Sequence, residues 1–149
     1  FANFLYDEST CKIVLLDFGA TKPLDTKTVN NFRMLINASL RQNTEEIKRY
    51  LNKLELITTD LPPDILNSIL DLIKKYSLPV IEGQLFDFSN PLLIHDMEIF
   101  SKKLMISRKK IAIPPINTLL IQRKIGGIFL LARRFRASIN LKKIIDRYI

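Results

Sequence analysis

Two short hydrophobic runs at the start of the chain predict a β-hairpin. Residues 3–6 and 12–18 are rich in aromatic and aliphatic side chains, and the polar stretch 7–10 separates them. Strands of this composition joined by a short polar segment are typical of a hairpin. Gly19 interrupts the second run, and the hydrophobic positions then follow the spacing of a helix. We therefore expect a strand, a turn and a second strand, followed by helices.

Three helices are predicted in the first half of the chain. A hydrophobic residue recurs every three or four positions over residues 26–41, which predicts the first helix. Asn43 and Glu46 have the spacing of a capping box, so a second helix is expected to begin there and to run to about residue 54. Pro62 and Pro63 suit the first turn of a third helix, and the broad apolar face that follows them predicts burial.

A loop is expected where Pro79 and Gly83 interrupt the helical pattern. It carries Phe86, Asp87 and Phe88, and the two aromatic side chains are interpreted as anchors to the helical core rather than as a stacking site for a ligand. A helix over residues 94–105 follows this loop.

The hydrophobic pattern of the C-terminal part predicts one long helix and one short helix. Residues 116–135 are apolar enough for a core helix with basic residues on one side. A glycine inside a helix costs about 1 kcal/mol relative to alanine, so a close backbone contact is expected at Gly126 and Gly127. A last helix over residues 141–148 completes a mainly α fold with a small N-terminal β-hairpin.

Composition supports one packed unit. The chain has 149 residues, of which 47% are hydrophobic and 26% charged, as is usual for a globular domain. Cys11 is the single cysteine and has no second thiol for an internal disulfide or a structural zinc site. It lies within or beside a predicted hairpin strand and is interpreted as a small packing residue, with a reactive thiol as the minor alternative. No stretch reaches the ~18 to 20 uninterrupted apolar residues that a membrane-spanning helix needs.

The charge of the chain is divided unevenly. Residues 1–100 hold 10 Lys or Arg and 14 Asp or Glu, whereas residues 101–149 hold 13 Lys or Arg and only Asp146 as an acid. Such a basic block attracts nucleic acid, anionic lipid or an acidic protein, and it also occurs on solvated helix faces. Nucleic acid is the least favoured partner, because the block has neither aromatic stacking positions nor a recognised binding motif.

Asp17, Phe18 and Gly19 follow the second predicted strand and suggest a metal site. The triplet alone is typical of a strand that ends in a turn. Asn3, however, lies 14 positions earlier, across the predicted hairpin. In kinase-type phosphotransferases an Asn and the Asp of a DFG triplet hold the magnesium ions that bridge nucleotide phosphates. Carboxylate and amide oxygens are the hard ligands that magnesium prefers.

With these residues in place, the chain resembles the C-terminal half of the UbiB/ADCK family of atypical kinases, in its mitochondrial coenzyme Q branch. The resemblance covers nearly the whole chain and rests on four ordered segments, which are residues 3–7, 15–21, 86–88 and 123–130. It implies that the fold is the C-lobe portion of a protein-kinase-like α+β fold. It also implies that Asn3 and Asp17 are magnesium ligands in an ATP-binding site.

The resemblance also has departures and gaps. Lys22 stands where this branch usually has Arg, and Gln122 stands where relatives commonly have His. The family's catalytic-loop Asp would lie five residues before Asn3, upstream of Phe1, as would the N-lobe and the KxGQ extension. No catalytic residue is therefore assigned within this chain. Residues 1–149 are expected to form a single partial domain that is inactive alone, while the intact parent is an enzyme.

The resemblance implies a magnesium-dependent kinase or ATPase that supports ubiquinone biosynthesis. Its expected partners are a nucleotide, a lipid intermediate or anionic membrane surface, and proteins of a coenzyme Q biosynthesis complex, with no nucleic acid. The expected location is the periphery of the mitochondrial inner membrane, or a bacterial cytoplasm or membrane surface. The alternative function is a non-catalytic basic helical module that binds a membrane surface or a protein complex. His95 is assigned no role, since no nucleophile or second metal-type ligand lies near it in the sequence.

Overall fold

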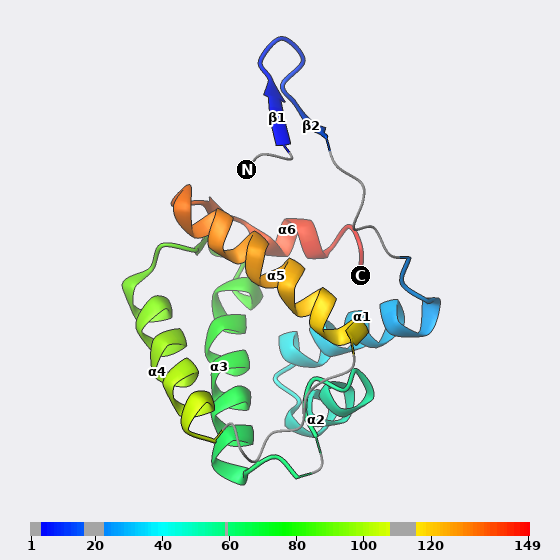
Figure 1. The fold of residues 1–149 in the computed structure, drawn as a ribbon, viewed down its shortest axis with the longest axis vertical. Helices are drawn as coiled ribbons and strands as arrows, with labels where there is room; N and C mark the ends of the chain where they lie inside the picture. Colours follow the sequence, from blue (N-terminus) through cyan, green and yellow to red (C-terminus); the bar gives the residue numbers. More distant parts are fainter. Residues whose placement is uncertain (1–3, 17–22, 59, 108–115) are drawn as a thin grey trace.

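The computed structural model describes residues 4–16, 23–58, 60–107 and 116–149 (Figure 1). Over these ranges the secondary structure is mainly helical, with two short antiparallel strand pairs. The helices pack into one body, and the N-terminal hairpin projects away from it (Figure 1). The mainly α fold with a small N-terminal hairpin is therefore confirmed.

The hairpin consists of β1 (Phe4–Asp7) and β2 (Lys12–Leu15), which pair in antiparallel fashion with Phe4 opposite Leu15. The turn between them begins at Asp7. Its carboxylate accepts hydrogen bonds from the backbone and hydroxyl of Ser9 and from the hydroxyl of Thr10. The polar stretch thus forms the turn because its short side chains bond to each other and to the local backbone.

Helices α1 (Thr26–Leu40) and α2 (Thr44–Lys53) match the periodicity of the sequence closely. The side chain of Asn43 caps α2 by accepting a hydrogen bond from the backbone N–H of Glu46. Glu46 does not complete the predicted capping box, because its carboxylate pairs with Arg41 at 3.2 Å. Only half of that motif is therefore formed.

Helix α3 (Pro63–Ile81) begins at the predicted prolines and runs farther than the sequence suggested. Pro79 was expected to open a loop, but it lies inside the last turn. Proline there removes one backbone hydrogen bond close to the helix end, where the helix stops two residues later. Gly83 makes the actual exit, with a positive φ of 68° that glycine adopts without a steric penalty.

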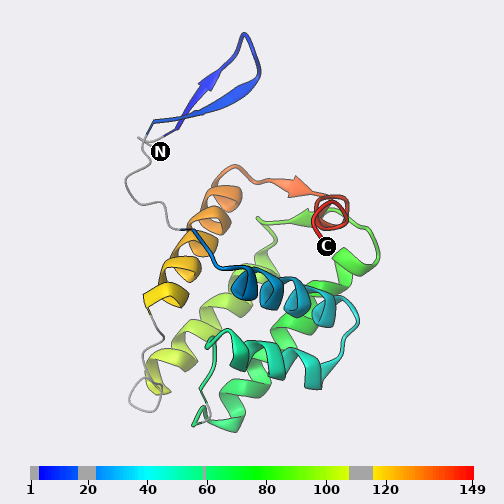
Figure 2. The same ribbon diagram turned by 90° about the vertical axis from the view of Figure 1, so that its right-hand side faces the viewer.

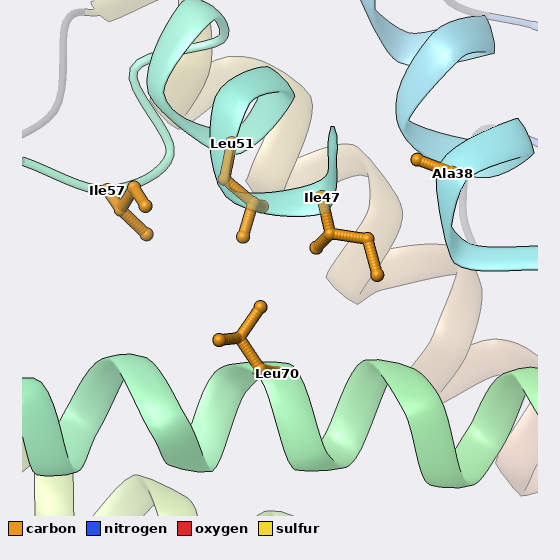
Figure 3. Packing of buried hydrophobic residues seen from close by; sticks show 5 residues of the cluster. All are labelled: Ala38, Ile47, Leu51, Ile57 and Leu70. Carbon is orange, nitrogen blue, oxygen red and sulfur yellow. The ribbon is translucent and has the colours of Figure 1, made fainter. Parts of the chain in front are cut away.

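The core lies where α1, α2 and α3 meet (Figure 3). Ile47 and Leu51 of α2 face Leu70 of α3, with Ala38 of α1 and Ile57 of the loop after α2 on either side. Ala38 and Ile47 have no exposed surface. The predicted burial of the third helix is confirmed by Ile65, Leu70 and Val80, which are buried on it.

Helix α4 (Pro91–Ser107) starts three residues earlier than expected, because the Asn90 side chain accepts from the backbone N–H of Leu92. It packs against α3 through polar contacts as well as apolar ones. Lys103 donates to the backbone oxygen of Asp64 and to the hydroxyl of Ser68, both at 2.8 Å. Tyr76 donates to Asp96 at 2.6 Å. These bonds fix α4 along the length of α3.

The C-terminal elements depart most from the sequence prediction. Helix α5 (Ile116–Arg134) has the expected length, but it is not a core helix, because most of its described side chains are exposed. Helix α6 (Leu141–Ile145) is shorter than expected and continues as turns. Two strands that the sequence did not predict, β3 (Phe86–Asp87) and β4 (Ser138–Ile139), pair beside α6 (Figure 2).

Candidate functional site

The predicted magnesium ligands lie outside the described residues. Asn3 and Asp17 fall in the ranges 1–3 and 17–22, together with Gly19 and Lys22. The structure describes the hairpin that connects them. Asn3 immediately precedes Phe4, and Asp17 follows Leu15 by two positions, while Phe4 and Leu15 are paired residues at the open end of the hairpin. The convergence of the two side chains stays a prediction.

The catalytic position is not covered by the structure either. The resemblance implies a catalytic-loop Asp upstream of Phe1, and Phe1 itself falls in the range 1–3, outside the described residues. The structure therefore neither supports nor opposes that expectation. No described residue is assigned a catalytic role, and the upstream Asp stays a prediction.

Both faces of the hairpin carry exposed apolar side chains. Leu5, Val14, Phe4 and Leu15 are all exposed, as are Tyr6 and Ile13. Successive residues of a strand point to opposite faces, so the apolar surface is two-sided. The hairpin is held by its own ladder and turn rather than by burial against the helices.

The Asp7 carboxylate is held by hydrogen bonds within the turn. The hydrogen bonds from Ser9, and next those from Thr10, lower the pKa of the Asp7 carboxyl to about 2. Cys11 closes the turn with a φ of 52° and is exposed. Its interpretation as a packing residue is wrong, because the turn directs its thiol toward the backbone oxygen of Glu8 instead of toward a core.

The segment around Asp87 is an anchor, as the sequence analysis interpreted it. The Phe88 ring packs edge-on against Phe86, at 4.9 Å between centroids, and against Phe129 of α5, at 5.8 Å. Phe86 in turn contacts Tyr76 of α3. Asp87 accepts from the hydroxyl and backbone of Ser89, and these bonds lower its pKa. The aromatic side chains therefore join the loop to α3 and α5.

Helix α5 presents a basic and partly apolar surface to solvent. Arg123 and Lys124 are exposed, as are Leu120, Ile128 and Leu130. The sequence analysis expected a core helix with basic residues on one side. Neither Arg123 nor Lys124 forms an ion pair in the described part of the chain, so both charges face solvent.

The expected close backbone contact at Gly126 and Gly127 is not made by any residue that the structure describes. Within the described ranges, a Cβ atom at either position would meet no atom within 4 Å. The reason is the position of α5, whose glycines lie on a surface that no other described element covers closely.

His95, to which the sequence analysis assigned no role, is exposed on α4.

One concave site was not found by sequence reasoning. An open groove of about 420 Å³ lies between α1, α5 and α6, and nearly all of its lining residues are hydrophobic. Val29 and Ile36 come from α1, Ile121 and Ile125 from α5, and Ile145 from α6. The signal in the sequence was the run of isoleucines near the C-terminus, but periodicity alone does not show that three distant segments share one groove.

The described ranges contain no group of three or more His, Cys, Asp or Glu side chains placed to hold a metal ion. No helix among them is sufficiently long and apolar to cross a membrane.

Comparison with known proteins places the chain in a family. A family model described as the ABC1 atypical kinase-like domain matches residues 1–51. The mitochondrial atypical kinase COQ8 of Saccharomyces cerevisiae is 33% identical over 147 residues, which are 96% of this chain and 28% of that protein. The chain belongs to the UbiB/ADCK family of atypical kinases.

Other relatives of this UbiB/ADCK chain support the same family assignment. The mitochondrial atypical kinase COQ8 of Schizosaccharomyces pombe is 27% identical over 149 residues, covering 96% of this chain and 23% of that protein. The mitochondrial atypical kinase COQ8B of Rattus norvegicus is 24% identical over 143 residues, covering 96% and 27%. The chain thus spans about a quarter of the length of the curated relatives it matches.

Proposed function

We propose that this chain is the metal-binding part of an ATP-binding, magnesium-dependent atypical kinase or ATPase that supports ubiquinone biosynthesis. The observation that carries the proposal is the paired hairpin inside the family match. Residues 1–51 contain both predicted ligands and the antiparallel strands that follow Asn3 and precede Asp17.

Chain geometry supports a shared site for the two ligands. Asn3 is one residue from Phe4, and Asp17 is two residues from Leu15, which is the partner of Phe4 in the hairpin. Because each residue of an extended chain spans at most about 3.6 Å, both proposed ligands are tethered close to this pair. The donor set also fits, because an amide oxygen and a carboxylate oxygen are hard ligands of the kind magnesium takes. Asp7, the acid of β1, accepts hydrogen bonds within the turn at the opposite end of the hairpin.

In this proposal Asn3 and Asp17 hold magnesium, which when bound neutralises charge on the nucleotide phosphates. The hairpin pairs Phe4 with Leu15, which are close in sequence to the two proposed ligands. The catalytic Asp and the N-lobe are proposed to be supplied by residues upstream of Phe1. Positioning of the phosphates between the two lobes is the main source of catalysis in kinase-type enzymes.

The proposed location and partners follow from the relatives and from charge. Three relatives are named as mitochondrial kinases, which supports a mitochondrial location of the parent protein. We propose in addition that it lies at the periphery of the inner membrane. The exposed basic residues of α5 and α6 are proposed to meet anionic lipid, and a lipid intermediate or proteins of a coenzyme Q biosynthesis complex are the proposed partners. The alternative, a basic helical module without catalysis, is favoured by the same surface.

The test is nucleotide hydrolysis by the full-length protein. Asp17→Asn removes a ligand charge at nearly constant volume and is expected to abolish magnesium-dependent turnover while the circular dichroism spectrum stays unchanged. Asp60→Asn is the matched control, since Asp60 is an exposed acid far from the hairpin in sequence, and its turnover should be unaltered. Near-normal turnover in Asp17→Asn would exclude Asp17 as a required ligand and favour the non-catalytic alternative.

A further inference from the structure

The groove between α1, α5 and α6 has the wall chemistry of a hydrocarbon site. Its volume of about 420 Å³ falls in the range of roughly 300–1,000 Å³ that small-molecule sites occupy. Its walls are built from aliphatic side chains such as Val29, Ile121 and Ile145, and even Arg33 and Tyr148 contribute almost only their apolar parts to the lining. Little in such a wall satisfies a polar ligand, whereas burial of an alkyl chain is favourable in proportion to its area.

The groove remains open because α5 covers it loosely. Ile125, which lines the groove, is 56% exposed, and Ile144 and Tyr148 of the α6 region are also exposed. Apolar surface that faces water in a concavity is surface that a ligand can bury. The chain therefore carries a preformed apolar site that its own described residues do not fill.

The three segments that form the groove, which are α1, α5 and the C-terminal segment that begins with α6, are strongly basic. Residues 26–40, 116–134 and 141–149 together carry nine Lys or Arg and one acid, Asp146. Arg33 lines the groove itself, and Lys124 precedes the lining residue Ile125 on α5. Neither cation forms an ion pair with any described residue. Charge complementarity thus favours an occupant that is anionic at one end and apolar at the other.

We propose that this groove binds the hydrocarbon tail of an anionic membrane lipid, with the headgroup held by Arg33 and Lys124. The proposal rests on the lipid-binding part of the proposed function and deepens it by naming the site. A lipid fits better than an extended peptide, because an extended backbone brings N–H and C=O groups that need partners, and the lining offers almost none. Arg33 in the lining and Lys124 next to the lining residue Ile125 then supply positive charge for one anionic headgroup.

The first experiment measures alkyl phosphate binding to the full-length protein by calorimetry, below the critical micelle concentration of each probe. The affinity is expected to rise from octyl to decyl phosphate by up to about fourfold per added methylene. Burial of one methylene contributes about 0.8 kcal/mol to the binding free energy, which corresponds to that factor. Inorganic phosphate should give no saturable binding. An affinity that does not depend on chain length would overturn the proposal, because it would mean that the groove is not used.

A matched pair of variants on α5 locates the site. Ile125→Asp places a charge in the groove and should weaken decyl phosphate binding at least tenfold. Ile128→Asp places the same charge three residues away at nearly equal exposure, 57% against 56%, but outside the lining, so its binding should stay within twofold of the unaltered chain. Equal losses in the two variants would overturn the proposal, and circular dichroism checks that both fold.

A second pair tests the headgroup. Arg33→Gln should weaken decyl phosphate binding about fivefold, and Arg49→Gln on α2, which makes the same change in net charge outside the lining, should weaken it less than twofold. Co-sedimentation with phosphatidylserine vesicles should rank the Ile125 and Ile128 variants in the same order as decyl phosphate does. If Ile125→Asp instead changes only the oligomeric state of the chain, the groove is a protein contact and the proposal fails.

The result is separable from the kinase proposal. Asp17→Asn is expected to bind decyl phosphate like the unaltered chain, and Ile128→Asp is expected to keep normal nucleotide turnover. If neither the unaltered protein nor any variant turns over nucleotide, while Ile125→Asp and Ile128→Asp still differ in decyl phosphate binding, only the proposed catalytic function fails. If turnover depends on Asp17 while the two isoleucine variants behave alike, only the groove proposal fails.

Discussion

Helices α2 and α5 both combine isoleucine with basic residues, but Ile47 of α2 and Ile128 of α5 lie in opposite environments. Ile47 of α2 has no exposed surface, whereas Ile128 of α5 is 57% exposed. Helix α2 packs against both α1 and α3, so its apolar face has partners on either side. Helix α5 borders an open groove. The difference teaches that an apolar helix is buried only where other elements supply surface on more than one side.

The strongest test of this comparison replaces an isoleucine in each region. Ile47→Ala is expected to lower the free energy of unfolding by about 2–5 kcal/mol, because it leaves a cavity in a closely packed core. Ile128→Ala should change it by about 0.5 kcal/mol or less, as is usual for exposed positions. Urea denaturation measures both values. Equal losses would mean that α5 is covered in solution.

A smaller effect is expected at the cap that holds α2 against α1. Asn43→Ala removes the side-chain oxygen that accepts from the N–H of Glu46 and should cost about 1 kcal/mol of stability. The control is Asn67→Ala, at an exposed interior position of α3, where alanine is the better helix former and stability should not fall. Thermal unfolding of the two variants separates capping from a general effect of asparagine loss.

Charge in the two regions should matter differently for membrane contact. Arg123→Gln on α5 is expected to weaken binding to phosphatidylserine vesicles by about fivefold, since each basic residue near an anionic surface contributes about 1 kcal/mol. Arg49→Gln removes the same charge from α2, where Arg49 lies over the Tyr50 ring, and should have little effect. Binding by the unaltered chain should fall as salt is added. Salt-insensitive binding would contradict an electrostatic contact.

The smallest expected effect concerns the hairpin turn. Because the pKa of Asp7 is lowered to about 2, its contribution to turn stability is fully present above the ordinary pKa of about 3.8 and is lost as pH falls through about 2. Ser9→Ala removes the largest cause and should raise the pKa of Asp7 toward its ordinary value. A carboxyl titration by NMR measures this shift, with Ser101→Ala on α4 as the control. An unchanged pKa in Ser9→Ala would mean that the turn is held otherwise.

Much of the local structure was predictable from the sequence. The hairpin, the turn at Asp7, the start of α2 at Asn43 and the start of α3 at Pro63 depend on residues that are neighbours in the chain. Turns and caps are made by short-range hydrogen bonds, so their signals are local. The family resemblance was likewise carried by short ordered segments, and the comparisons confirm it. The two proposed metal ligands came from the same local reading and stay predictions.

The tertiary structure alone decided where α5 lies and what its residues do. Its apolar composition predicted a core helix, and its glycines predicted a close backbone contact, yet it borders an open groove, and no other element of the described ranges contacts Gly126 or Gly127 closely. The β3–β4 pair and the groove each join segments that are far apart in the chain. Periodicity shows which face of a helix is apolar but not how much surface the other elements have left to cover it. That depends on long-range packing, which one sequence read segment by segment does not contain.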